Sequence, residues 1–263
     1  MRTAEKTLLL WITVLLFSNT VFASGHGKLV LIVDDLGNQY RAGVDAIANP
    51  WITTVAIMPG RPYTRLLAEY ANAQGKEVII HSPMSNTTDF PLGELGLDRT
   101  QGREAMIENV RLSVADVPYA VGLSNHMGSR LTQDTVAMDW LMRELQLHQL
   151  FFFDSRTVST TQAWKVAEKR QVPWAMRHYF LDHFKEPAFM QSQWNEAITR
   201  VQNGENITVI CHPYPETLAF LNSLSLDENE RNTLVPLSSV LNYPEPGKRS
   251  DRNIPKEPVL QGP

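Results

Sequence analysis

The sequence has a single cysteine, Cys211, so an intrachain disulfide bond is excluded. A chain of this length must then be stabilised by its hydrophobic core, even if it is exported. Cys211 lies in the apolar segment ITVICHP, which predicts a buried strand. Adjacent side chains on a strand point to opposite faces, so His212 is directed away from the thiol. We therefore interpret Cys211 as a structural residue and not as a nucleophile.

The sequence also lacks an excess of basic residues. It contains 24 Lys and Arg against 28 Asp and Glu, which gives a formal net charge of -4 at pH 7. No basic cluster stands near the motifs described below. Nucleic acids and anionic lipids are therefore excluded as expected partners.

The apolar run near the N-terminus favours a cleaved segment, with an uncleaved membrane anchor as the alternative. Residues 8–17 are mainly apolar, about half of the roughly 20 residues that such a helix needs. Arg2 and Lys6 precede the run and Val21-Phe22-Ala23 follows it, which is typical of a secretory signal peptide at residues 1–23. We expect cleavage after Ala23, a periplasmic location with secretion as the alternative, and no stable membrane insertion after cleavage.

The rest of the chain is predicted to form one domain, residues 24–242, and a disordered tail, residues 243–263, rich in proline and charge. In the domain, short apolar segments alternate with segments of helical periodicity. The expected strands lie in KLVLIVDDLG, ITTVAIMPG, KEVIIHSPM, PYAVGLSNHMGS, LFFFDSRT and ITVICHP, with a weaker one at VPWAM and a closing one in TLVPLSSVL. About seven β/α cycles predict an α/β fold, a distorted (β/α) barrel around a parallel sheet.

Polar side chains recur at the C-terminal ends of the predicted strands, which form the catalytic face of a β/α barrel. They are Asp34, Asp35, His81, Asn125, His126, Asp154 and His212. Taken singly, each could have a purely structural role, as an acid that caps a turn or a histidine that hydrogen-bonds to a loop. Their recurrence at equivalent points of different strands indicates one shared site, and carboxylate with imidazole is a common ligand set for divalent zinc.

These motifs resemble a known family. The ordered set IVDDLG, HSPM, SNHMGS, FFDSRT, RHYFLD and CHP is similar to the divergent polysaccharide deacetylases, the YibQ-like proteins, over roughly residues 28–242. That family is a distant relative of the NodB-type carbohydrate esterases. The resemblance implies the NodB-like distorted barrel and metal-dependent removal of acetyl groups from a polysaccharide or glycan.

The resemblance also implies roles for individual residues. In the NodB type the first motif supplies a catalytic base followed by a metal-binding aspartate, which correspond to Asp34 and Asp35. The last motif supplies a histidine acid, which corresponds to His212. We expect Asp154 to orient His212 or to bind substrate.

This chain departs from the NodB pattern at the second motif. That motif offers two metal histidines four residues apart, whereas this chain has His81 and then Ser85. We expect His126, at the end of the following strand, to replace the missing ligand, because adjacent strand ends of a barrel can reach one ion. The predicted metal ligands are therefore Asp35, His81 and His126, and the donor set favours Zn²⁺.

The remaining polar residues of the family pattern are expected either to support the site residues or to contact substrate: Asn125, Ser129, Ser155, Arg177 and Asp182. Of these, Asn125, Ser129, Arg177 and Asp182 are the predicted substrate contacts. His178 and His183 receive no role. The missing histidine leaves a second hypothesis open, a catalytically inactive periplasmic relative that binds a glycan or a protein. A metal-dependent phosphoesterase ranks last, because no basic cluster near the motifs would hold an anionic group. The sequence makes no prediction of the glycan or of the oligomeric state.

Overall fold

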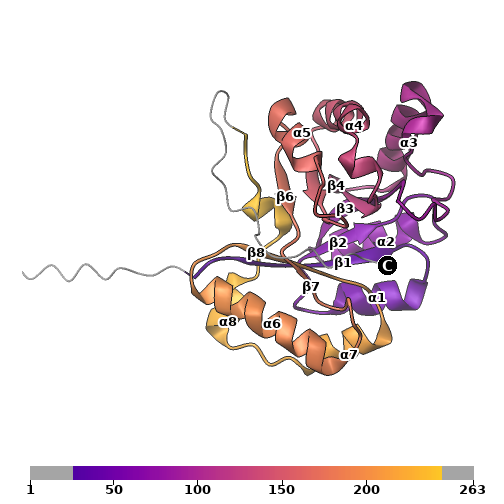
Figure 1. The fold of residues 1–263 in the computed structure, drawn as a ribbon. Helices are drawn as coiled ribbons and strands as arrows, with labels where there is room; N and C mark the ends of the chain where they lie inside the picture. Colours follow the sequence, from indigo (N-terminus) through magenta and orange to yellow (C-terminus); the bar gives the residue numbers. More distant parts are fainter. Residues whose placement is uncertain (1–25, 245–263) are drawn as a thin grey trace, which may run out of the picture.

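The computed structural model describes residues 26–244, in which parallel strands alternate with helices (Figure 1). The strands are β1 (Leu29–Leu36), β2 (Thr54–Ile57), β3 (Glu77–Met84), β4 (Ala120–Met127), β5 (Phe151–Asp154), β6 (Trp174–Met176), β7 (Tyr179–Phe180) and β8 (Ile207–Cys211). The helices are α1 (Tyr40–Ala48), α2 (Thr64–Ala73), α3 (Arg103–Asp116), α4 (Thr135–Leu147), α5 (Ala163–Arg170), α6 (Pro187–Gln202), α7 (Pro215–Ser223) and α8 (Glu228–Thr233). Short 3₁₀ helices are η1 (Arg99–Gln101), η2 (Leu131–Gln133) and η3 (Leu237–Val240).

The predicted signal peptide and the tail from residue 245 onward lie outside the described residues. Within residues 26–244, no helix combines the length and the apolar character needed to cross a membrane.

All eight strands form one sheet in the order β6-β5-β4-β3-β2-β1-β8-β7, and every neighbouring pair is parallel. The edge strands β6 and β7 are separated in the chain only by Arg177 and His178. The N–H of Arg177 donates to Asp154 O (2.9 Å) in β5, and that of His178 to Thr208 O (3.0 Å) in β8. These two residues therefore join the two edges of the curled sheet, and the predicted α/β barrel is confirmed with one strand more than expected.

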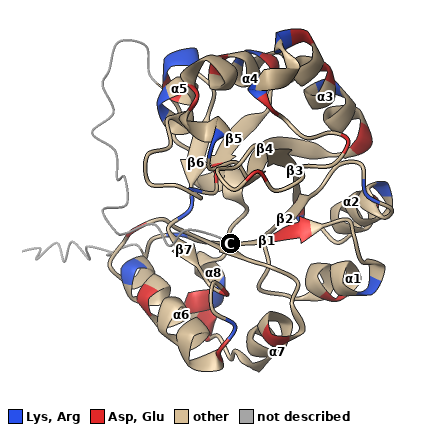
Figure 2. Ribbon diagram, turned by 45° about the vertical axis from the view of Figure 1, so that its right-hand side comes forward, with Lys and Arg blue, Asp and Glu red and all other residues tan. Residues whose placement is uncertain are grey.

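Side chains of the strands are buried on both faces of the sheet, which explains their continuous apolar sequences. Along β1, Leu29, Leu31 and Val33 belong to the large core between the sheet and the surrounding helices. Val30 and Ile32 point to the other face and pack in a smaller cluster with Phe151 and Phe153 of the other strands. Figure 2 shows the charged residues mainly on the helices and loops around this sheet.

The predicted closing strand in TLVPLSSVL is wrong. The segment ends α8, passes through Pro236, which has no N–H to donate to a strand ladder, and forms η3. Its contacts with the sheet include a single bridge between Leu234 and Leu29. The buried Leu237 packs with the smaller cluster, and its N–H donates to Thr54 Oγ1 (3.1 Å), so the segment covers the end of the barrel where strands begin.

Cys211 is fully buried in β8, and its Sγ lies 3.5 Å from Ile32 O. Burial raises the pKa of this thiol well above its ordinary value, so the thiolate is disfavoured. The predicted structural role of Cys211 is therefore confirmed.

Candidate active site

Two adjacent carboxylates face one cavity because β1 is irregular at its end. The pairing of β1 with β2 changes register between Val33 and Leu36, and Asp35 adopts a left-handed backbone conformation with φ 63°. On a regular strand the side chains of Asp34 and Asp35 would point to opposite faces. The bulge brings both into the cavity lining, at the cost of a conformation that non-glycine residues rarely adopt.

Asp35, His81 and His126 form the candidate metal centre. Asp35 Oδ1 lies 2.8 Å from His126 Nδ1 and 3.1 Å from His81 Nε2, and the three ligand atoms all lie within 4.8 Å of one another. Neither contact is a hydrogen bond, since Asp35 Oδ1 has no hydrogen-bond partner within the described residues. Converging donor atoms that do not bond to each other fit a divalent cation, and the adjacent strands β3 and β4 deliver both histidines as the sequence predicts.

The tautomer of His81 is set by Ser124, which sequence reasoning missed. Ser124 Oγ lies 2.7 Å from His81 Nδ1 and 3.3 Å from Ile80 O. The carbonyl of Ile80 can only accept, so the serine hydroxyl donates to it and accepts the proton of Nδ1. The lone pair of Nε2 is then left on the side of Asp35, as a metal ligand requires.

Asp34 is a buried carboxyl group with an unpartnered oxygen. Only 1% of the residue is exposed, and no group in residues 26–244 hydrogen-bonds to Oδ1. Burial raises the pKa of Asp34, and the nearby His81 and His212 only partly offset it. For Asp35 burial acts in the same direction, but contacts with His126 and His81 outweigh it and hold the pKa well below its usual range. The pKa values of the two neighbouring acids are therefore shifted in opposite directions.

His212 follows β8 and is held by Asp182, which follows β7. Asp182 Oδ1 lies 3.1 Å from His212 Nδ1, while Oδ2 accepts from the N–H of His212 (2.7 Å) and from Thr217 Oγ1 (2.7 Å). Burial disfavours the charged imidazole, but Asp182 outweighs it and raises the pKa of His212 to about 9. Nε2 faces the metal centre, 3.8 Å from Asp35 Oδ2. Asp182 thus fixes the orientation of the His212 ring and favours its protonated form.

Asp154 does not orient His212, contrary to one of the two roles expected for it. Its carboxylate accepts from Arg156 N (2.9 Å) and from Thr161 Oγ1 (2.8 Å), in the loop that follows β5. Asp154 is fully buried and does not line the cavity. Asp154 ends β5, near one edge of the sheet, whereas Asp182 follows β7, the strand at the other edge, which pairs with β8. Since His212 follows β8, Asp182 and not Asp154 faces it.

Only some of the predicted substrate contacts line the cavity. Asn125 lines the cavity, and its Oδ1 accepts from Ser155 N (2.9 Å). Arg177 is buried beneath the same loop, where its Nε donates to Ser155 O (2.6 Å). Ser129 lies outside the lining, and its Oγ accepts from Thr87 N (3.0 Å). Of the four predicted contacts, therefore, Asn125 and Asp182 reach the cavity directly.

The cavity that contains these groups has a volume of about 320 Å³. Its lining consists of Asp34, Asp35, His81, Asn125, His126, Met127, Ser155, Thr157, Phe180, Asp182, His183, Lys185, Ile210, His212 and Tyr214. His183, Lys185 and Tyr214 were not predicted as site residues. They could have been found from their position, because they lie in the loops that follow β7 and β8, at the same end of the barrel as the other site residues.

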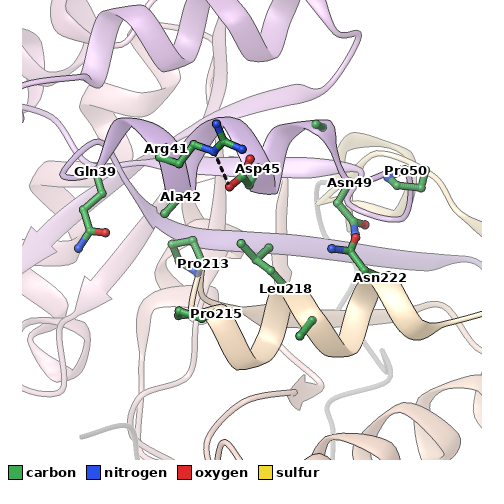
Figure 3. A pocket seen from close by; sticks show the side chains of 12 residues that line it. Gln39, Arg41, Ala42, Asp45, Asn49, Pro50, Pro213, Pro215, Leu218 and Asn222 are labelled. Carbon is green, nitrogen blue, oxygen red and sulfur yellow. Dashed lines mark hydrogen bonds and ion pairs between the residues drawn. The ribbon is translucent and has the colours of Figure 1, made fainter.

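A larger depression of about 680 Å³ lies between α1 and α7 (Figure 3). It is lined by polar and small side chains, and its one acid, Asp45, pairs with Arg41 (3.0 Å) on the same helix. Asn49 donates to Asn222 (3.0 Å) across it. The lining contains no histidine and no cysteine, so the candidate active site is assigned to the smaller cavity.

Comparisons with known proteins identify the family of this chain. Residues 31–241 match a family described as divergent polysaccharide deacetylase. The chain is 33% identical over 259 residues to "Uncharacterized protein YibQ" of Escherichia coli (strain K12), covering 97% of this chain and 80% of that protein. It is 31% identical over 259 residues to an uncharacterized protein of Haemophilus influenzae, covering 98% of this chain and 89% of that one.

The fold is similar to the crystal structure of uncharacterized protein ATU2773 from Agrobacterium tumefaciens C58. The TM-score is 0.75 at 17% identity, and the match covers 81% of this chain and 89% of that chain. The motifs in the sequence, the curled parallel sheet and the sequence matches lead to one conclusion. This chain belongs to the divergent polysaccharide deacetylase family.

Proposed function

We propose that this protein is a metal-dependent hydrolase that removes acetyl groups from an envelope polysaccharide or glycan. The observation that carries the proposal is the arrangement around Asp35. Two histidine nitrogens converge on its carboxylate, Asp34 beside it has an Oδ1 without a hydrogen-bond partner among the described residues, and Nε2 of the Asp182-held His212 lies 3.8 Å from Asp35 Oδ2. Family membership supports a carbohydrate as the substrate class.

The residues that would hold the ion are Asp35, His81 and His126, and this donor set suits Zn²⁺. A bound divalent cation supplies positive charge that polarises the acyl carbonyl and makes a neighbouring water easier to deprotonate. Ser124 supports this arrangement by keeping the lone pair of His81 Nε2 on the side of Asp35.

The proton transfers are assigned to two residues of the chain. Asp34 takes a proton from the attacking water, whose oxygen forms a bond to the acyl carbon. His212 gives a proton to the sugar nitrogen or oxygen as its bond to the acyl carbon breaks, so acetate and a free amine or hydroxyl leave. Asp182 keeps the imidazole oriented, with Nε2 toward the reacting groups.

The alternative is a relative that binds glycan without turnover. It rests on Ser85, which stands where the NodB type has a second metal histidine. His126 Nδ1 supplies a third ligand atom from the neighbouring strand, which weakens the reason for the alternative. We therefore favour catalysis.

The direct test is acetate release from N-acetylglucosamine oligomers and from peptidoglycan by the zinc-loaded protein. We expect turnover, with kcat reduced about 10²- to 10⁴-fold in Asp34→Asn and in Asp182→Asn, since both remove proton-transfer function. Ser129→Ala is a matched control on the same face that should keep full activity. Zinc binding without acetate release from either substrate would instead support the binding alternative.

We further propose that the protein acts after export, which the pattern in residues 1–23 supports. N-terminal sequencing of protein from the periplasmic fraction should begin at Ser24. Recovery of the chain with Met1 in the cytoplasmic fraction would contradict export.

A further inference from the structure

One wall of the cavity carries a cation that the proposed reaction does not use. Lys185 and Tyr214 both line the cavity, beside His212. Lys185 Nζ lies 3.5 Å from the centroid of the Tyr214 ring, and this ring stacks on His212 with centroids 5.4 Å apart and an interplanar angle of 29°. The cation–π contact therefore holds the ammonium group next to the proposed acid.

Lys185 is the one lysine or arginine in the cavity lining. Two acids of the lining contact its histidines, since Asp182 contacts His212 and Asp35 contacts His81 and His126. No ion pair of Lys185 with a carboxylate occurs within residues 26–244. An ammonium group at the mouth of a site, without a counter-ion of its own, suits a negatively charged group on the ligand.

Beside this cation lies an exposed aromatic surface. Phe184 is 53% exposed, and its ring packs edge-on against His183 (4.5 Å) and Phe189 (5.1 Å). Sugar rings present C–H faces that pack on exposed aromatic side chains, and an exposed apolar surface next to a site indicates ligand contact. The loop after β7 thus offers an apolar platform and a positive charge side by side.

Other exposed aromatic side chains follow strands at the same end of the barrel. Tyr40 and Tyr63, which follow β1 and β2, are 47% and 37% exposed, and their ring centroids lie 5.7 Å apart. Phe90, in the loop after β3, is 64% exposed. These rings lie outside the cavity lining but in segments that follow strands at the same end of the barrel, where a ligand longer than one sugar unit would extend.

We propose that Lys185 and Phe184 form a subsite for a sugar unit that bears a carboxylate, next to the unit that loses its acetyl group. The inference rests on the proposed function, because it places this subsite beside the reacting unit. A monoanion is favoured over a phosphate dianion, because three carboxyl groups, Asp34, Asp35 and Asp182, line the same cavity and repel a higher charge. The carboxylate belongs either to a hexuronic acid or to a lactyl ether on an amino sugar.

The test measures binding of oligosaccharides to the zinc-loaded Asp34→Asn protein by calorimetry, so that no ligand is consumed. Three tetrasaccharides are compared: a neutral N-acetylglucosamine oligomer, one that alternates with glucuronic acid, and one that alternates with the lactyl ether of N-acetylglucosamine. We expect at least one carboxylated oligomer to bind about five-fold more tightly than the neutral one. The tighter of the two identifies the source of the carboxylate.

Two further variants test whether Lys185 and Phe184 cause the preference for carboxylated oligomers. Lys185→Gln should abolish the preference and leave affinity for the neutral oligomer unchanged, whereas Phe184→Ala should weaken all three ligands. Lys169, exposed in the last turn of α5 and therefore at the opposite end of the barrel, provides the control Lys169→Gln, which should keep the preference.

Equal affinities for the neutral and carboxylated oligomers, no measurable binding of any, or a preference that survives in Lys185→Gln would overturn the subsite. Failure of the proposed function has a different signature. In that case the wild-type protein releases no acetate while the Lys185-dependent preference remains.

Discussion

At the scale of single residues, the candidate site depends on conformations that place side chains against local preference. Asp35 occupies a left-handed conformation, and Met127, directly after His126, does the same with φ 54°. Such residues persist where the surrounding structure over-determines them and cluster at functional sites. Both lie where a strand delivers a group to the candidate metal centre, and they are two of seven non-glycine residues with positive φ in residues 26–244.

Ser124 provides a test of the metal centre that leaves its ligands intact. Ser124→Ala removes the acceptor of the His81 Nδ1 proton, so the ring is free to adopt the wrong tautomer and orientation. We expect zinc affinity to fall about 10- to 100-fold, measured by competition with a chromophoric chelator.

The matched control is Ser82→Ala in β3, the strand of His81. Ser82 is also fully buried, but its Oγ has no hydrogen-bond partner among the described residues. Its zinc affinity should equal that of the wild type. If the two alanine variants bind zinc equally, Ser124 does not position His81.

At the scale of elements, small residues decide how neighbouring strands fit. Gly122 in β4 lies beside Phe151 in β5, and a Cβ built at Gly122 would approach the Phe151 ring to 2.3 Å. Phe151 fills the smaller apolar cluster of the sheet. The absence of a side chain at Gly122 is thus what allows the ring to pack there.

Gly122→Ala should therefore lower the free energy of unfolding by about 1–3 kcal/mol through overpacking. Urea denaturation followed by circular dichroism measures the change. Val121→Thr, at the adjacent position whose side chain is 43% exposed, should change stability by less than about 0.5 kcal/mol. A Gly122→Ala variant as stable as the wild type would show that the ring has room to move.

Most of the elements were predictable from the sequence because their apolar periods are strong. The α1 helix, which has nine residues, was not among the predicted elements. The β7 strand has two residues, too few to show any period. The predicted closing strand failed because apolar residues that cover a barrel end look like strand residues in sequence.

Some features of the candidate site were also predictable from the sequence, and others were not. Asp35, His81 and His126 were predictable, because each ends a recognisable strand and parallel strand ends meet. The pairing of His212 with Asp182 instead of Asp154 was not, since it depends on which strands form the sheet edges. Ser124 was missed because a buried serine inside a strand carries no signal until the register with His81 is known.

At the scale of the whole molecule, the barrel is held together at one seam. His178 lies between the edge strands, and its Nδ1 accepts from Thr208 N (3.2 Å) in β8. Burial lowers the pKa of His178 to about 4, and the positive charges of Arg200 and Arg156 add to this effect while Glu205 opposes it. The imidazole at the seam is therefore neutral when the protein is folded.

Stability should consequently depend on pH. The pKa of His178 is about 4 in the folded state and 6.5 as the ordinary value, so between these pH values the unfolded chain binds the proton and the folded chain does not. The free energy of unfolding should fall by at most about 3 kcal/mol from this residue as pH drops from 7 to 4.

Urea denaturation at intervals between pH 4 and 7 measures this dependence. In His178→Gln the part of the slope that belongs to His178 should disappear, even if the variant is less stable at neutral pH. An unchanged slope in the variant would assign the pH dependence to other groups.

The measurement that tests the central claim most directly is zinc titration of the purified apoprotein by calorimetry, with wild type and His126→Ala compared. The geometry predicts one zinc per chain in the wild type and at least about 100-fold weaker binding in His126→Ala, because one of three protein ligands is removed. Circular dichroism confirms that the variant is folded. Equal zinc affinity in the folded His126→Ala protein would contradict the assignment of His126 as the third ligand.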